Sequence, residues 1–449
     1  MTLSRRKLLA LSGATALVPA LAACGGGPAT SDGIEYWAAF PDELQRDYFR
    51  QKRADAFQGA ADVQLTIKPS ETIGRLTQTA LAAGAGPDLI ATAGPAQVAA
   101  YAGAGYLLSL DEYARDYGWD EDLAPWALAA SQVNGGLVSL PAGYESMIML
   151  YNPATLAANN WSVPTNRGEF EAICADAHAK GIVPVAAGNG DWRAASEWPV
   201  SFALNHYAGP DAVHQVLQGH LPWTEPVIVD AITLLSGWFQ RGWFGGSVEN
   251  YFTNSFAKLY ASLASGDAVF MITGSWALSE ISPYFGEEAG NDATWDWAPL
   301  FPLRDEVPQE VWDLGIGQTL SINARSARPD AVAEYLDFLE TDPVRQAEGI
   351  AEVGLQPAPV PLTRADFPDS VDERQSRLYV ALSNATTIGY TTWTFCPQET
   401  DTDLYTNFDK VFTGQLDAHE YCAGLDKIFQ KELALGKVPA APAPDGLVR

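Results

Sequence analysis

The chain has 449 residues, of which 47% are hydrophobic and 18% charged, and its formal net charge is −28 at pH 7. This length and hydrophobic content predict two or three globular domains and exclude an intrinsically disordered protein. The acidic balance repels phosphates, so nucleic acid and anionic lipid headgroups are excluded as partners.

The N-terminal residues have the layout of an export signal. Three basic residues precede an apolar stretch that is too short to span a bilayer and that ends in small residues before Cys24. This arrangement resembles the bacterial lipoprotein box, so we expect residues 1–23 to be a signal peptide, Cys24 to be acylated and residues 24–32 to form a lipidated tether. Residues 4–9 also resemble a twin-arginine signal, but paired arginines are common in ordinary signals, so the export route stays open.

The first predicted elements alternate between strand and helix. Residues 34–38, 63–67 and 88–91 are predicted as strands, and the first of them ends in an aromatic-rich loop. Apolar residues at helical spacing follow over 73–81 and 95–102. This alternation is typical of an α/β sheet with helices on its faces.

The later elements continue this pattern. Residues 146–151 form a compact apolar run that predicts a buried strand, and Asn166 with Glu169 resembles a capping box at a helix start. Pro329 begins a helix with one apolar face, and residues 425–433 carry another apolar stripe. Without an internal repeat or a low-complexity linker, two closely associated α/β lobes with several crossings are expected.

The cysteines beyond Cys24 leave two alternatives open. Cys174, Cys396 and Cys422 show no C-x-x-C spacing of a metal or redox site. Outside the cell a Cys396–Cys422 disulfide would leave Cys174 as a buried thiol, whereas three buried thiols are the other expectation.

Motifs of several enzyme classes are absent from the sequence. The five histidines form no H-E-x-x-H pair, and there is no G-x-S-x-G elbow, complete G-x-G-x-x-G or phosphate-binding loop. Asp401 and Asp403 are better interpreted as solvated or helix-capping acids than as metal ligands. We therefore expect no catalytic residues, no metal and no cofactor. A glycoside hydrolase or lyase needs only two carboxylates, so this class remains an alternative.

Five segments with moderately specific patterns follow one another along the chain. They are residues 81–89, 101–111, 140–153, 164–170 and 263–276. In this order they resemble the family-1 extracellular solute-binding proteins of bacterial ABC importers, the group that includes maltose-binding proteins. The last segment is the most specific, because its glycine and apolar run leads through a Gly-Ser turn to a tryptophan. The chain departs from the family where Pro153 replaces the usual lysine and where residues 164–170 lack the usual tryptophan.

The resemblance implies an α/β, two-lobed periplasmic-binding-protein-like fold of type II, with a ligand cleft between lobes joined by crossing strands. The first lobe would comprise residues 33–140 and 272–322, and the second residues 145–270 and 323–449. Closure of the lobes about the ligand would signal the loaded state to a permease.

Sugars present flat C–H faces edged by hydroxyls, which suit aromatic rings combined with carboxylates and amides. Trp276 matches the family's cleft tryptophan, and Glu145 matches an acid near the hinge of maltose-binding relatives. The other candidates lie in the loop after the first strand, next to Glu145 in the sequence, in a polar–aromatic loop of the second lobe, and in the C-terminal part of the second lobe. The candidate ligand-binding residues are Trp37, Phe40, Glu43, Tyr144, Glu145, Asp191, Trp192, Trp198, Trp276 and Trp393.

The resemblance therefore implies a binding protein and not an enzyme. It would be a monomeric, lipid-anchored substrate-binding component of an ABC importer at the outer face of the cytoplasmic membrane. It would capture a carbohydrate and dock on permease subunits that a cytoplasmic ATPase drives. A glycerophosphodiester or another polar metabolite is an alternative ligand; a phosphate would require a cleft cation, and only Arg193 adjoins the candidates. A surface sensor or adhesin is a third reading of the fold.

Overall fold

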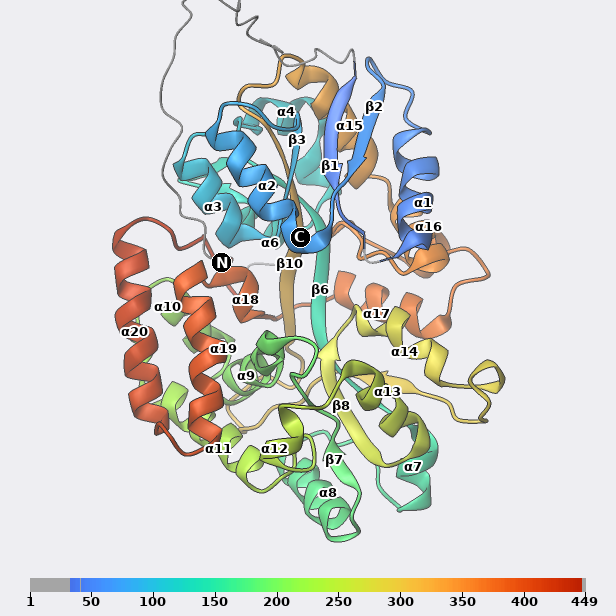
Figure 1. Ribbon diagram of the computed structural model, residues 1–449, viewed down its shortest axis with the longest axis vertical. Coiled ribbons are helices and arrows are strands. Elements are labelled where there is room, and N and C mark those ends of the chain that lie inside the picture. Colours follow the sequence, from blue (N-terminus) through green and yellow to red (C-terminus); the bar gives the residue numbers. More distant parts are fainter. Residues whose placement is uncertain (1–32, 41, 446–449) are drawn as a thin grey trace, which may run out of the picture. The chain divides into compact units, whose positions relative to one another are not determined.

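The computed structural model describes residues 33–40 and 42–445, so the expectations for the signal peptide, Cys24 and the tether lie outside the described residues. One mixed sheet runs through this part of the chain (Figure 1), in the strand order β2-β1-β3-β10-β6-β8-β7, with β11 paired to β10 and β9 to β6. The strands of the sheet are β1 Ile34–Ala38, β2 Val63–Ile67, β3 Leu89–Thr92, β6 Leu140–Tyr151, β7 Val183–Val185, β8 Ala268–Gly274, β9 Asp296–Ala298, β10 Trp312–Ile322 and β11 Ile388–Tyr390. A short hairpin, β4 Gln132–Val133 with β5 Gly136–Leu137, stands apart from it.

Two long strands, β6 and β10, pass through both lobes (Figure 1). They pair antiparallel from Leu314 opposite Ser146 to Leu320 opposite Leu140, with register irregularities between Ile316 and Thr319. The predicted strand 146–151 is only the second half of β6. The sequence of the first half contains Pro141 and Gly143, which weaken a strand prediction.

The first lobe confirms the predicted alternation of strands and helices. β1 pairs parallel with β2 and β3, and β3 pairs antiparallel with β10. Helices cover both faces of this part of the sheet (Figure 1). The helices of this lobe are α1 Glu43–Phe49, the π-helical turn η1 Arg50–Ala54, α2 Ser70–Ala82, α3 Pro95–Gly103, α4 Asp111–Tyr117, α5 Trp119–Asp122, α6 Pro125–Ala130, α15 Pro329–Glu340 and α16 Pro343–Val353.

The second lobe is built around β8 and the end of β6 that pairs with it, Met147 to Tyr151. Both strands are almost wholly buried, and Phe170, Phe202 and Trp238 pack together beside them. Its helices are α7 Pro153–Ala158, α8 Arg167–Ala179, α9 Glu197–Ala203, α10 Pro210–Leu217, α11 Pro226–Gln240, α12 Val248–Tyr251, α13 Phe256–Ser265, α14 Ala277–Ile281, α17 Glu373–Ser383, α18 Thr392–Phe395, α19 Gln398–Phe412 and α20 Ala418–Ala434.

The contacts of two segments differ from the expected lobe boundaries. In α15, the ring of Tyr335 lies 4.9 Å from that of Phe57, and Trp119 Nε1 donates to Asp337 at 3.0 Å, so this helix packs in the first lobe. Conversely, β9 pairs with the second-lobe end of β6. We therefore propose that residues 329–353 belong to the first lobe and 277–301 to the second, because apolar packing and not sequence order decides membership.

Two local predictions have definite outcomes. Cys174, Cys396 and Cys422 are free and buried, so of the two alternatives the structure has three buried thiols. At α8 the predicted helix start is confirmed, since Asn166 Oδ1 accepts from Glu169 N at 3.0 Å. The capping box is not reciprocal, however, because the Glu169 carboxylate accepts from Thr165 instead. Among the helices of residues 33–40 and 42–445, none combines the length and apolarity needed to cross a membrane.

Candidate ligand-binding cleft

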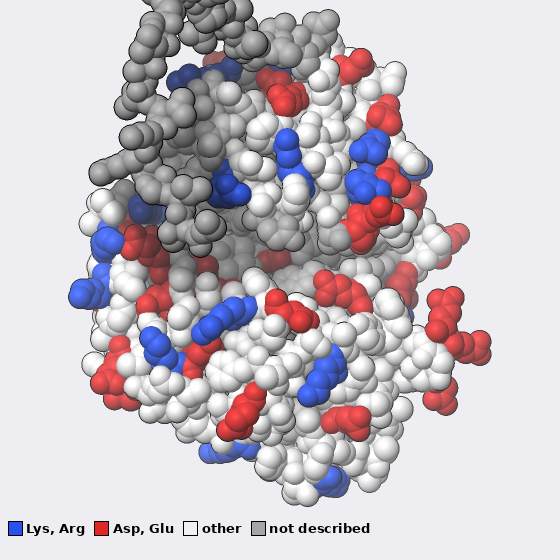
Figure 2. Space-filling view, in the orientation of Figure 1, with Lys and Arg blue, Asp and Glu red and all other residues white. Residues whose placement is uncertain are grey.

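The candidate site is a cavity of about 570 Å³ to which both lobes and both crossing strands contribute. Figure 2 shows the surface hollowed across the middle of this face. In the first lobe the lining residues come from β1 and the loop after it, from α1, η1 and α2, from β3 and α3, and from α15, α16 and the residues that follow α16. The crossing strands β6 and β10 and, in the second lobe, Trp276 and α14 supply the rest. The side chains used below are Tyr36, Phe40, Phe49, Arg53, Thr92, Gln97, Trp276, Glu280, Gln318, Glu340 and Gln356.

Trp276 lies on the second-lobe side of this cavity, directly after β8 and at the start of α14. Its indole folds back over its own strand, so a Cβ at Gly274 would lie 1.9 Å from Cζ3 of Trp276. No side chain other than hydrogen fits there. The glycine of the Gly-Ser-Trp sequence therefore sets the direction of the tryptophan ring, which explains the spacing on which the sequence prediction rested.

Four tryptophans form a continuous row behind and beside the cavity. The ring of Trp198 lies 5.7 Å from Trp192 and 5.4 Å from Trp276, and the ring of Trp276 lies 6.1 Å from Trp393. Trp198 is buried and stacks on Phe256, with 18° between the ring planes. The row joins segments that are far apart in the sequence. Trp198 and Trp393 pack against Trp276, and Trp192 packs on Trp198; of the four rings, Trp276 is the one that lines the cavity.

Glu145 fixes the last ring of this row. Its Oε1 accepts from Trp393 Nε1 at 2.7 Å, and its Oε2 accepts from Gln356 Nε2 at 3.0 Å. Burial raises the pKa of the Glu145 carboxyl, and these two hydrogen bonds oppose that rise. A Cβ at Gly317 would lie 2.9 Å from Glu145 Oε2, so the backbone of β10 closes over the carboxylate.

Phe40 is the member of the first-strand loop that the structure brings to the cavity. Its ring packs 5.1 Å from that of Phe49, which also lines the cavity. Trp37 lies on the other face of β1 from the lining residue Tyr36, donates to Glu35 at 2.7 Å and carries Lys68 over its ring.

Three further candidates also lie away from the cavity. Glu43 is exposed at the first turn of α1 and pairs with Arg46, as is favourable for an acid at a helix N-terminus. Tyr144 is buried among aromatic rings. Asp191 accepts from the backbone N of Phe256 at 2.7 Å and so caps α13.

The sequence reasoning missed a polar group at the first-lobe end of the cavity. Arg53 and Glu340 both line it, although their exposed fractions are only 3% and 5%. Burial raises the pKa of Glu340 to about 8, while the positive charges of Arg53 and Arg345 oppose the rise. One signal was present: Glu340 stands four residues after Leu336 on the apolar stripe of α15, where an acid is not expected.

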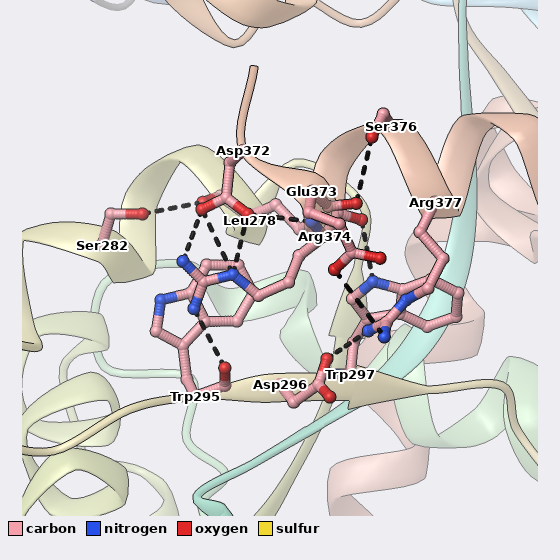
Figure 3. Close-up of polar contacts among 10 residues, drawn as sticks. All are labelled: Leu278, Ser282, Trp295, Asp296, Trp297, Asp372, Glu373, Arg374, Ser376 and Arg377. Carbon is pink, nitrogen blue, oxygen red and sulfur yellow. Dashed lines mark hydrogen bonds and ion pairs between the residues drawn. The ribbon is translucent and has the colours of Figure 1, made fainter. Parts of the chain in front are cut away.

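Two arginines of α17 contact residues 295–297, a segment far from this helix in the sequence (Figure 3). Arg374 lies 3.8 Å over the ring of Trp295, donates to its backbone O and pairs with Asp372. Arg377 lies over the ring of Trp297 and pairs with Asp296. These contacts attach α17 to residues 295–297.

No group of three or more His, Cys, Asp or Glu side chains that could hold a metal ion occurs in the described part of the chain. The side chains that line the cleft include aromatic rings, amides, carboxyls and the guanidinium of Arg53.

Comparison with known proteins identifies the family. The family model for the bacterial extracellular solute-binding protein matches residues 41–346. A probable sugar-binding periplasmic protein of Mesorhizobium japonicum is 26% identical over 187 residues, which are 40% of this chain and 42% of that protein. Among solved structures, a chitin oligosaccharide binding protein is 18% identical with a TM-score of 0.74, over 90% of this chain and 100% of its own. The sugar-binding protein MalE of Xanthomonas citri is 18% identical with a TM-score of 0.69, over 90% and 98%.

The structural matches confirm the two-lobed α/β fold that the sequence patterns predicted. The family is one of binding proteins, which confirms the prediction that the chain is not an enzyme. The match of the family model over most of the chain also confirms the resemblance. The chain belongs to the bacterial extracellular solute-binding protein family.

Proposed function

We propose that the protein is the lipid-anchored substrate-binding component of an ABC importer and that it captures a carbohydrate in the cleft beside Trp276. The observation that carries the proposal is the indole of Trp276, which lines a cavity together with the amides of Gln97, Gln318 and Gln356. Relatives described as sugar-binding, in sequence and in fold, support a carbohydrate as the ligand class.

An aromatic platform supplies enough free energy to matter. A pyranose that stacks on one indole removes about 150 Å² from water, which corresponds to at most ~4 kcal/mol before the ordering costs are subtracted. Trp276 would provide this surface on the second-lobe side, and Trp393, which contacts its ring and is held by Glu145, would fix the position of the indole. Phe40 would face the ligand from the first lobe.

The polar lining suits hydroxyls. Thr92, Gln97, Gln318 and Gln356 present neutral groups, and a hydroxyl both donates and accepts hydrogen bonds with such groups. Arg53 is a cation that a phosphodiester would require, but it already donates to the backbone O of Arg345 at 2.8 Å. Its charge is opposed by Glu340. We therefore favour a neutral sugar over a glycerophosphodiester.

The crossing strands provide a hinge for capture and delivery. The register irregularity of β10 lies beside the cavity at Gly317, where the backbone has freedom to absorb a change of lobe angle. Closure would bury the sugar and present the loaded protein to permease subunits. Cys24 and the export-signal layout before it support an anchor on the outer face of the cytoplasmic membrane.

A thermal-shift screen of the purified protein tests the proposal. The panel contains galactose, maltotriose, xylotriose and chitotriose, with glycerophosphocholine and amino acids for comparison. A ligand that binds only the folded state stabilises it by about 2.7 kcal/mol when the ligand concentration is a hundred times Kd. This stabilisation raises the melting temperature. A shift with one sugar class, with the sugar recovered unchanged, is expected. A shift with glycerophosphocholine alone, or consumption of the sugar, would contradict the proposal.

A further inference from the structure

The first-lobe end of the cavity holds two polar side chains without partners. Tyr36 from β1 and Glu340 from the end of α15 both line it, with exposed fractions of 2% and 5%. Among the described residues, no hydrogen bond ends on the Tyr36 hydroxyl or on the Glu340 carboxyl. Because both side chains line the cavity and their polar atoms are not used by hydrogen bonds of the fold, these atoms are available to a ligand that enters it.

The other acids at or next to the cavity already accept hydrogen bonds within the chain. Both oxygens of Glu145, which contacts the lining residue Gln356, accept hydrogen bonds, from Trp393 and Gln356. One oxygen of Glu280 accepts from the hydroxyl of Tyr260 at 2.6 Å. The lining amide of Gln346 donates to Leu339 O at 2.7 Å and accepts from Ala358 N at 3.1 Å. Glu340 thus differs from these side chains because its carboxyl makes no hydrogen bond within the described part of the chain.

The charges around Glu340 select the ligand's chemistry. Arg53, from η1, is the cation that lines the same end, and its Nη2 is held by Arg345 O at 2.8 Å, so its position is fixed. The fixed positive charge of Arg53 would repel a ligand ammonium, whereas a neutral hydroxyl meets no such repulsion. A hydroxyl donates to an ionised carboxylate, accepts from a protonated one and also bonds a phenol.

We propose that Tyr36, Arg53 and Glu340 form a subsite that binds a hydroxyl-bearing end of the sugar and discriminates against sugars that carry an ammonium group at that end. This inference rests on the proposed function, because it assigns the polarity of one end of the carbohydrate site. The raised pKa of Glu340, about 8, agrees with it, since a carboxyl near its pKa serves as donor or acceptor without fixing a charge. Phe49 and Leu355 exclude water on the apolar side of the subsite.

The test compares neutral sugars with charged counterparts of the same ring. Calorimetric titrations are run at pH 7 with galactose and galactosamine, and with chitotriose and the deacetylated chitosan trimer. The neutral member of a pair is expected to bind at least about tenfold more tightly, which is the discrimination of one well-placed polar contact. Equal binding of the charged member would overturn the inference.

Variants of the subsite complete the test. Glu340→Ala is expected to weaken binding of the tightest neutral probe by about tenfold and Tyr36→Phe by about threefold, since each removes one hydrogen-bonding group. Glu340→Gln, whose amide also donates and accepts, should restore most of the affinity, which a purely structural role would not predict. Glu348→Gln, an exposed acid of α16, is the matched control and should bind like the wild type.

The outcomes separate two failures. If a neutral sugar binds the wild type but Glu340→Ala and Tyr36→Phe leave its Kd unchanged, the subsite is wrong and the proposed function stands. If none of the sugars binds the wild type, the proposed function fails and this inference fails with it. Should Glu340→Ala lose its folded circular-dichroism spectrum, the nearly isosteric Tyr36→Phe variant decides.

Discussion

The indole Nε1 of Trp393 donates a 2.7 Å hydrogen bond to the carboxylate of Glu145, a residue 248 positions earlier in the chain. Glu145 lies on the crossing strand β6, whereas Trp393 lies on α18 of the second lobe. The pair therefore connects the hinge of the molecule to the aromatic row that borders the cleft. Gln356 completes the carboxylate's hydrogen bonds.

We expect Glu145→Ala to lower the free energy of unfolding by about 1–3 kcal/mol, because it leaves buried donors on Trp393 and Gln356 without an acceptor. Glu145→Gln retains one acceptor and should cost less. Urea denaturation measures both. Glu43→Ala, which removes an exposed acid, is the control; a Glu145→Ala variant as stable as that control would contradict the assigned role.

Trp276→Ala should weaken sugar binding by roughly ten- to a hundredfold, since it removes the stacking surface on the second-lobe side. Trp37→Ala is a matched control, because Trp37 lies on the other face of β1 and contacts Glu35 and Lys68. Titration calorimetry with the best sugar of the panel compares the two. Equal losses of affinity would show that Trp276 is not a specific platform.

The pH dependence of stability should carry the signature of Glu340. Its pKa is about 8 in the folded protein and about 4.3 in an unfolded chain, so the folded state binds more protons between these values. The stabilisation is fully present below about pH 4 and is lost as the pH rises to 8. The charged or titratable groups that face Glu340 are Arg53, Arg345, Tyr36 and Tyr335.

Glu340→Gln removes this titration. Between pH 5 and 8 the wild type should lose roughly 2–4 kcal/mol more stability than the variant, by urea denaturation at each pH. Buried Glu197 and Asp401 titrate in both proteins, so they cancel in the difference. Parallel profiles would show that the Glu340 carboxyl titrates as if it were in water.

The arginine contacts of α17 should contribute more to the stability of the folded protein than exposed charges do. Arg374→Met removes an ion pair to Asp372, a hydrogen bond to Trp295 O and a contact over the Trp295 ring, so we expect a loss of about 1–3 kcal/mol. Arg75→Met, at an exposed position of α2, should change stability by less than about 0.5 kcal/mol. Thermal unfolding of both variants provides the comparison, and equal melting temperatures would contradict the prediction.

The sequence predicted those features that depend on local pattern. Strand–helix alternation depends on residues close in sequence, so the first-lobe sheet followed from it. Trp276 was proposed from the pattern that leads to it, and the structure places it on the cavity. Trp37 stays a prediction that the position of the cavity does not favour, because one residue of register decides which face of β1 a side chain occupies. Neither lobe membership of α15 nor the meeting of Arg53 with Glu340 has a local signal, because both depend on packing between distant segments.

The most direct test of the central claim is a calorimetric titration of the wild type and Trp276→Ala with galactose, maltotriose, xylotriose and chitotriose, each recovered afterwards. Binding beside Trp276 predicts a saturable heat with at least one unmodified sugar in the wild type, and a Kd at least about tenfold higher in the variant. No saturable heat with any of these sugars, or the same Kd in both proteins, would contradict carbohydrate capture at this cleft.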